Sequence, residues 1–385
     1  MPRATVEQMR NANWLELFYD LVFAAAVITF SDAVSHYPEP AVIGVVSASF
    51  VAVWLIWLAT TFYVNSFGID DSLHRFLVVV QMLLLTLMSL AVGDGLDRNP
   101  ELASVSFALL AINVGIMYGR HARSDEVNSA FATMRRNQYL VAALPVFVAA
   151  VVPMPVRAGL WAISIVLVAI PALGCRVGGL ARATPLDEAH LVERLGLLTI
   201  IVIGESFVKV SLVVSDGHLD GIDVLVLVAL FVAVFAIWWA YFDDVPEAGI
   251  RDGIAASIGW LLGHLLFQLF LVGVAIAYAK WLQLEIADQF TGDRSLLGAA
   301  PYVGAILALA LIGACSRRVP QRQLLALRCG TALVVLALGI LNWRVLVLDL
   351  ETDAIALSSI ALIHSVIASR LQRATHVTEV QTAAP

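Results

Sequence analysis

Apolar residues gather along the chain in twelve stretches of about 20 residues, which short polar segments separate. A helix of this length crosses the ~30 Å hydrocarbon core of a bilayer. Pro153 and Pro155 separate the fifth stretch from the sixth, because proline cannot continue a helix. The pattern therefore predicts an all-α, polytopic transmembrane helix bundle with about twelve spans. The predicted spans are 14–36, 41–64, 74–92, 102–120, 138–153, 156–174, 191–214, 222–242, 254–279, 299–316, 325–342 and 354–370.

The composition favours the same class of protein. The chain has 385 residues, of which 60% are hydrophobic and 14% are charged, whereas about 25% of the residues in soluble proteins are charged. The expected partners are the lipid bilayer and a small solute or ion, with no nucleic acid. Cys175, Cys315 and Cys329 show no metal-ligand spacing. Their odd number argues against a disulfide framework, so we expect free thiols.

Positive charges are distributed unevenly between the two sets of loops. Sixteen arginines fall in one set, whereas the opposite set holds five arginines and lysines. Loops rich in these residues stay in the cytoplasm. Both termini are therefore expected there, which requires an even number of spans. Trp57 and Trp238 lie toward span ends and are expected to act as interface anchors.

The order of polar residues leaves open an internal repeat. The first and seventh spans each carry a glutamate near their start, and the third and ninth each carry a histidine and a glutamine. Two six-span halves, 1–175 and 176–375, would then be parallel repeats about an axis normal to the membrane. Composition alone also produces such a likeness, so both interpretations stay open. The segment 376–385 is expected to form a disordered tail.

The seventh predicted span carries four ionisable residues on one helical face. At ~100° per residue, His190, Arg194, Glu205 and Lys209 fall within an arc of ~100°. Each charge at the membrane centre costs ~2.5–3.5 kcal/mol, so this face must point into the bundle or a wet cavity. In one interpretation Glu205 couples transport, and Gly204 allows close backbone approach or a local break beside it. In the other, Glu205 and Lys209 form an i, i+4 pair that neutralises itself and only packs.

Acidic residues also mark the first predicted span. Glu16 and Asp20 lie one turn apart on a stripe that Ser31 continues. The functional interpretation is a cytoplasmic vestibule for a cation or proton. The alternative is that acids simply favour the first turn of a helix. We expect the stripe to pack inward near the start of the seventh span, with Glu193 or Arg194 within reach of a salt bridge.

The ninth predicted span places His264 and Gln268 one helical turn apart. A histidine inside a membrane can relay protons, because its charge changes near physiological pH. A histidine–glutamine pair also forms hydrogen bonds between helices. The spacing favours the second interpretation and leaves the first open.

Motifs of familiar enzymes are absent from the sequence. It has no phosphate-binding P-loop, no H-E-x-x-H helix, no G-x-S-x-G elbow and no C-x-x-C pair. We therefore expect a protein that is not an enzyme and that holds no cofactor or metal.

Two stretches resemble the bacterial low temperature requirement A (LtrA) family. WLELFYDLVF, residues 14–23, is similar to the family's opening, and HLVERLGLLTIIVIGES, residues 190–206, is similar to its His-x-x-Glu-Arg-x-Gly pattern and Gly-Glu-Ser ending. The resemblance implies a multi-pass protein of the bacterial inner membrane and supplies no substrate. The matching positions are Glu16, Phe18, Tyr19, Asp20, His190, Glu193, Arg194, Gly196, Gly204, Glu205 and Ser206.

The polar residues within the spans favour secondary transport of a small solute or ion, coupled to protons or another cation. Glu205 would be the coupling carboxylate, and Glu16 and Asp20 would form the cytoplasmic entrance. The alternative is a scaffold or lipid-associated factor that supports membrane function in the cold, with the polar residues as structural links. The candidate binding residues are Glu205, Lys209, Arg194, Glu193, His190, Asp20, Glu16, Ser206, His264 and Gln268.

Overall fold

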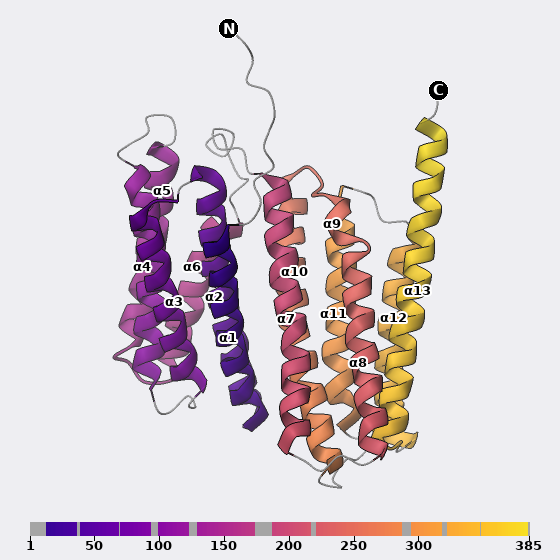
Figure 1. Cartoon of the computed structure of the whole chain (residues 1–385). Helices are drawn as coiled ribbons and strands as arrows, with labels where there is room; N and C mark the ends of the chain where they lie inside the picture. The colour runs from indigo at the N-terminus through magenta and orange to yellow at the C-terminus, as the bar shows by residue number, and fades with distance from the viewer. Residues whose placement is uncertain are drawn as a thin grey trace. The chain divides into compact units, whose positions relative to one another are not determined.

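The structure, a computed structural model, describes residues 13–36, 39–68, 70–93, 99–122, 129–173, 187–216, 221–286, 294–317, 322–346 and 348–383. Every regular element that these residues form is helical (Figure 1). α2 and α4 begin at a proline, which suits the first turn of a helix because no N–H is needed there. The elements are α1 Trp14–His36, α2 Pro40–Phe67, α3 Ser72–Gly93, α4 Pro100–His121, α5 Ser129–Ala149, α6 Val156–Leu173, α7 Glu188–Asp216, α8 Gly221–Phe242, α9 Val245–Ala248, α10 Ile254–Ile286, α11 Ser295–Cys315, α12 Arg322–Leu341, a π-helical turn Asn342–Leu346, and α13 Leu350–Ala383.

Each of the twelve predicted apolar stretches largely coincides with one long helix of the described chain, and the fifth, 138–153, runs past the end of α5 at Ala149. Ten of these helices are long and apolar enough to cross a membrane. The two others are α5 and α6. Polar residues of α5, including Arg135 and Arg136, lower its apolar character, and the apolar part of α6 is short, Val156–Pro171. The all-helical class is confirmed, whereas a count of twelve spans stays a prediction.

The chain divides into two compact units, and α1, α2 and α7 contribute residues to both. Unit 1 comprises Met1–Ala26, Ala52–Val92 and Leu96–Leu198. Unit 2 comprises Val27–Val51, Gly93–Gly95 and Thr199–Pro385. One boundary thus falls within α7 rather than near residue 175, and the predicted six-span halves, 1–175 and 176–375, stay a prediction.

Two further expectations concern the C-terminus and the cysteines. α13 continues to Ala383, past His376, where the sequence predicts a disordered tail, so that tail is not confirmed. Cys315 and Cys329 carry free thiols, and Cys175 lies outside the described residues.

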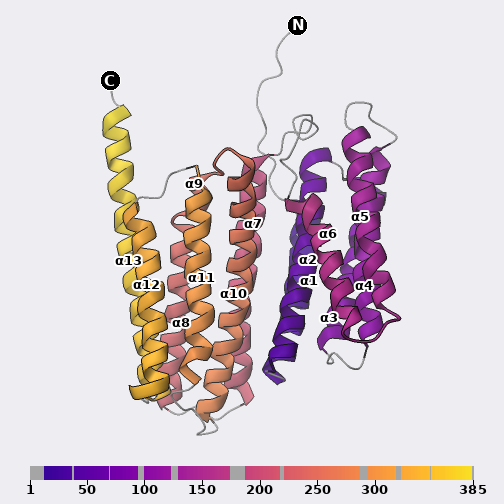
Figure 2. The ribbon, with the colours of Figure 1, turned by 180° about the vertical axis from the view of Figure 1, so that it is seen from behind.

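Unit 1 is held together by helix packing and by a ladder of buried hydrogen bonds. α5 packs against both α4 and α6 (Figure 2). The Thr60 hydroxyl of α2 lies 3.1 Å from Oε1 of Gln81 on α3, and Nε2 of Gln81 donates to Oδ1 of Asn113 on α4 at 2.9 Å. Hydrogen bonds between membrane helices contribute ~0.6 kcal/mol on average. The ladder therefore fixes α2 against α3 and α4.

In unit 2, α11 packs against both α10 and α12, and α13 packs against α8. Gly259 and Gly263 lie one turn apart on α10 and face α11. A Cβ atom at Gly263 would lie 2.6 Å from Cγ1 of Ile312, and one at Gly259 would lie 2.6 Å from Sγ of Cys315. Small residues at this spacing let membrane helices approach closely, so these glycines set the distance between α10 and α11.

A buried ion pair adds a polar link within unit 2. Nη2 of Arg328, on α12, donates to Oδ2 of Asp244 at 2.7 Å, and Nη1 donates to the carbonyl oxygen of Leu309 at 3.0 Å. Asp244 directly precedes α9. The pair therefore ties α12 to the segment between α8 and α10.

Large apolar side chains remain exposed on many helices. Trp14, Leu144 and Leu333 are 86%, 63% and 67% exposed. Water disfavours such a surface, whereas lipid accepts it. The exposed side chains therefore agree with helices that lie in a membrane.

Candidate functional site

Unit 1 contains a buried ion pair between α1 and α7. Nη2 of Arg194 donates to Oδ1 of Asp20 at 2.8 Å, and Nε1 of Trp57 donates to the same oxygen at 2.7 Å. Asp20 is fully buried and Arg194 is 1% exposed. The Arg194 guanidinium also lies 5.5 Å from the centre of the Trp57 ring, within the range of a cation–π contact. The predicted salt bridge between the first and seventh helices is confirmed.

Glu16 lies one helical turn before Asp20 and meets the same helix, α7. Its Oε2 atom accepts a hydrogen bond from the backbone N–H of Asn13 at 2.8 Å and lies 3.4 Å from Nε2 of His190. The backbone N–H of His190 donates to Oδ1 of Asp187 at 3.1 Å, a contact that begins α7. Oε1 of Glu16 is buried and has no hydrogen-bond partner in the described chain. One carboxylate oxygen thus stays available.

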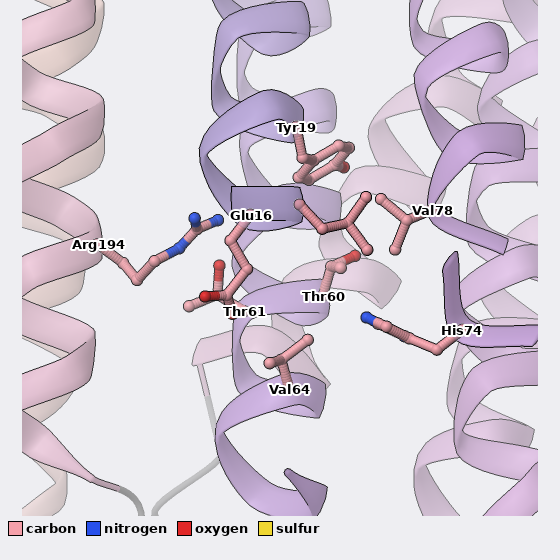
Figure 3. A pocket seen from close by; sticks show the side chains of 9 residues that line it. Glu16, Tyr19, Thr60, Thr61, Val64, His74, Val78 and Arg194 are labelled. Atoms are coloured by element: carbon pink, nitrogen blue, oxygen red, sulfur yellow. The ribbon is translucent and has the colours of Figure 1, made fainter. Parts of the chain in front are cut away.

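A small cavity of ≈ 10 Å³ opens beside Glu16 (Figure 3). A volume of about this size holds one water molecule. The residues that line the cavity come from α1, α2, α3 and α7. Figure 3 shows Arg194 and His74 on opposite sides of the view, with Glu16 between them. The lining residues are Leu15, Glu16, Tyr19, Thr60, Thr61, Val64, His74, Val78 and Arg194.

Glu205 has its own buried site in unit 2. The hydroxyl oxygen of Ser31 lies 2.5 Å from Oε1 of Glu205 and 2.8 Å from the carbonyl oxygen of Ile28. Oε2 of Glu205 is buried without a hydrogen-bond partner among the described residues. Glu205 is 3% exposed, and in the part of the chain that the structure describes its carboxyl group has the Ser31 hydroxyl as its hydrogen-bond partner.

Lys209 does not pair with Glu205, contrary to the self-neutralising interpretation. Nζ of Lys209 donates to Oδ1 of Asp32 on α1 at 2.5 Å. Gly204 also differs from expectation, because α7 continues unbroken through it and a Cβ atom there would meet nothing within 4 Å. The sequence showed that these positions share a face of one helix, but it did not show which partner on another helix each would meet.

Within each unit, the contacts between α1 and α7 follow the same order along both helices. The pairs Glu16–His190, Asp20–Arg194 and Ser31–Glu205 each join residues 174 positions apart in the chain. The pair Asp32–Lys209 of unit 2 joins residues 177 positions apart. Because these offsets are nearly equal, α1 and α7 run parallel to each other within each unit. The packing therefore places polar residues of α1 opposite polar residues of α7 within each unit.

The remaining candidate residues lie elsewhere. Glu193 is exposed, because it precedes Arg194 and so points to another side of α7. Ser206 is buried. Nε2 of His264 lies 3.1 Å from the Tyr241 hydroxyl, and Nε2 of Gln268 donates to Oγ1 of Thr199 at 2.9 Å. These are hydrogen bonds between helices, and a role of any candidate residue in binding stays a prediction.

Several residues around Glu16 and around Glu205 were not predicted from the sequence. The unit 1 cluster comprises Glu16, Asp20, Trp57, Thr61, His74, His190 and Arg194, and the unit 2 cluster comprises Ser31, Asp32, Glu205 and Lys209. Trp57, expected at an interface, is fully buried and binds Asp20 instead. Asp32, Thr61 and His74 were not expected at a site. Trp57 and Thr61 are four positions apart, so helical spacing places them on the same face of α2. No sequence signal joined either of them to Asp20 or Glu16.

Comparison with known proteins identifies the family. The family described as "Bacterial low temperature requirement A protein (LtrA)" matches residues 11–367. The chain belongs to the LtrA family. The resemblance drawn from the two motifs is thereby confirmed. The LtrA match includes all residues of both clusters, and the two motifs lie on α1 and α7.

A relative from Rhizobium meliloti (strain 1021) is similar to this LtrA chain along most of its length. That protein, named "Uncharacterized protein RA0937", is 22% identical over 313 residues, which cover 78% of this chain and 76% of its own. The likeness therefore extends well beyond the two motifs.

Among the residues that the structure describes, no group of three His, Cys, Asp or Glu side chains is arranged to hold a metal ion.

Proposed function

We propose that this LtrA chain is a secondary transporter of a small solute or ion, coupled to protons or another cation, without chemical conversion of its substrate. Membership of a multi-pass membrane protein family supports a location in a membrane. The proposal places the protein in the bacterial inner membrane, with twelve spans and both termini in the cytoplasm. Its partners would be the lipid bilayer and the transported solute.

The arrangement around Glu205 carries the proposal. A hydroxyl group has one proton to donate, yet the Ser31 hydroxyl contacts two acceptors, Glu205 and the Ile28 carbonyl. Both contacts can be linear hydrogen bonds at once only if Glu205 is protonated and donates to Ser31. The site is therefore suited to a carboxyl group that carries a proton inside the bundle.

Loss of that proton would leave a buried carboxylate that has no ion pair of its own among the described residues. The nearby ammonium group of Lys209 is already paired with Asp32. An uncompensated carboxylate buried in a membrane protein costs several kcal/mol. Binding of a cation or proton to Glu205 removes this cost. In the proposed transporter, binding at Glu205 therefore changes the relative free energies of the closed and open conformations.

The test is a flux measurement on purified protein in sealed lipid vesicles that contain a pH-sensitive dye. Gradients of Na⁺, K⁺ and phosphate are imposed one at a time. We expect at least one gradient to change the internal pH. Glu205→Gln should fold and lose most of that response, because an amide cannot take up and release the proton. Glu101→Gln, at an exposed glutamate of α4 that is not a candidate site residue, should keep the wild-type response.

Two results would contradict the proposal. A wild-type response in Glu205→Gln would remove Glu205 from coupling. No response of the wild-type protein to any gradient would favour the scaffold. One observation already favours a structural role for part of the polar network, since Asp20–Arg194 and Asp244–Arg328 are closely paired and buried. Under the scaffold alternative, replacing both Glu205 and Lys209 with apolar residues should leave a stable protein that supports growth in the cold.

A further inference from the structure

Several residues that line the cavity beside Glu16 carry buried polar atoms, five in all, without hydrogen-bond partners in the described chain. The residues that carry them are 8% exposed or less. Buried polar groups without a hydrogen bond are rare in native proteins and call for an explanation such as bound water. The atoms are Oε1 of Glu16, Oγ1 of Thr61, Nδ1 of His74, and Nε and Nη1 of Arg194.

The mixture of donors and acceptors selects the ligand. Arg194 offers only N–H donors, which repel a bare cation, and ionised Glu16 offers only acceptors, which repel an anion. Thr61 can donate or accept, and so can His74, according to its tautomer. Water both donates and accepts, and the volume of ≈ 10 Å³ fits about one molecule. The cavity is therefore chemically matched to water.

We propose that the cavity holds one bound water through which Glu16 and His74 exchange a proton. In the forward direction, protonated Glu16 gives the proton on Oε1 to the water oxygen. The water passes one of its own protons to the lone pair on Nδ1 of His74. An O–H bond breaks at Glu16, an N–H bond forms at His74, and the water is regenerated. The products are a carboxylate and an imidazolium.

The geometry keeps the two exchanging groups in fixed positions. Oε2 of Glu16 is held by Asn13 and His190, which leaves Oε1 for the water. The His74 ring stacks on Tyr63 with 5.9 Å between ring centres. Arg194, which lines the cavity, is held by Asp20 through Nη2, and its Nε and Nη1 atoms have no partner in the described chain. Each of the three groups is thus anchored by a neighbour and keeps an unpartnered polar atom that a water molecule can bind.

Other charged groups act on Glu16 and His74 from the helices packed against them. His190 and Arg194 of α7 face Glu16, and Asp20 follows it on α1. Arg120 of α4 and the two aspartates before α3 face His74. The charged groups concerned are Asp20, Asp70, Asp71, Arg120, His190 and Arg194.

Infrared difference spectra of the full chain in lipid bilayers test the water site. Spectra are recorded between acidic and neutral pH, in ordinary and in heavy-oxygen water. We expect a carboxyl band that Glu16→Gln removes, together with a water band that shifts in heavy-oxygen water. Thr61→Leu should fill the cavity and remove the water band. His74→Phe keeps an aromatic ring against Tyr63 and should alter both bands.

The control is Thr86→Leu, an exposed position on α3 whose hydroxyl donates to the Met82 carbonyl of its own helix. It should leave both bands unchanged. The proposal is overturned if no band responds to both heavy-oxygen water and Glu16→Gln. It is also overturned if both bands persist unchanged in His74→Phe, a result that does not depend on the folding of Thr61→Leu.

The exchange can serve as a route for a transported proton only if the proposed function holds. A flux measurement in vesicles distinguishes the exchange itself from proton transport. Thr61→Leu and His74→Phe should reduce the internal pH response of wild-type vesicles, whereas Thr86→Leu should not. A wild-type chain that shows both coupled bands but moves no proton would contradict transport while supporting the water-mediated exchange. Full flux in Thr61→Leu and His74→Phe, with both bands lost, would overturn the exchange as a route.

Discussion

At the scale of single residues, burial decides how much an ion pair matters. Arg194→Met should leave Asp20 fully buried, with the N–H of Trp57 as its main partner. Breaking a buried pair in this way costs ~3–5 kcal/mol. Arg75→Met breaks a pair whose side chains are 62% and 34% exposed, and such pairs contribute ~0–1 kcal/mol. Thermal unfolding in detergent should therefore show a much lower midpoint for Arg194→Met. Equal midpoints for the two variants would contradict a role of burial.

The exposed pair allows a prediction about pH. Hydrogen bonds from Arg75, with a further one from Asn13, lower the pKa of Asp70 to about 2 from an ordinary value of 3.8. Because this pKa is lowered, the pair favours the folded state above the ordinary value, and that contribution disappears as the pH falls through about 2. Arg75→Met should move the pKa of Asp70 back toward 3.8. A carboxyl titration followed by isotope-edited infrared spectroscopy measures the change, and an unaltered midpoint would be evidence against the pair.

At the scale of helices, two glycines allow a matched comparison. An added Cβ at Gly263 would press against Ile312 on α11, whereas one at Gly204 meets nothing within 4 Å. Overpacking costs ~1–3 kcal/mol. Alanine in a helix is preferred to glycine by ~0.5–1 kcal/mol. Gly263→Ala should therefore destabilise the protein and Gly204→Ala should leave it equal or more stable, as measured by thermal unfolding. A loss of stability in Gly204→Ala would instead support the close backbone approach that the sequence predicts at this position.

Helices are also the scale at which sequence patterns predict this protein best. Twelve apolar stretches correspond to twelve long helices because an apolar run of this length has few alternatives in a membrane. The buried stripe of Glu16 and Asp20 followed from helical spacing alone. α5 began earlier than expected, at Ser129, because its first turns are polar and carry no apolar signal.

Partners across helices could not be predicted in the same way. Asp32 meets Lys209 across 177 positions of the chain, and no spacing rule within one helix reaches that far. Trp57 was expected at an interface because tryptophan is common there. Its burial follows instead from the carboxylate of Asp20, which needs an N–H donor. The cavity beside Glu16 depends on four helices at once, so it emerges only from the packed structure.

At the scale of the whole molecule, the number of membrane crossings is open to a direct test. Twelve spans place the loop at Pro153 on the same face of the membrane as Asp220, opposite Pro385. If α5 and α6 do not cross, the loop at Pro153 shares the face of Pro385. Reporter fusions at these three positions distinguish the cases, because each reporter is active on one face only. We expect Pro153 and Asp220 to agree. Agreement of Pro153 with Pro385 would leave the ten helices that are long and apolar enough.

The register of α1 and α7 has a consequence for how the chain is made. Arg194 leaves the ribosome 174 residues after Asp20, which at ~5–20 residues per second takes roughly 9 to 35 s. During that time the new α1 holds Glu16, Asp20 and Asp32 without their basic partners on α7, and lipid penalises an unpaired charge. We expect the helix to wait in wet surroundings, or with its acids protonated, until α7 arrives. Insertion of the first helix would then be completed only after half of the protein has been synthesised.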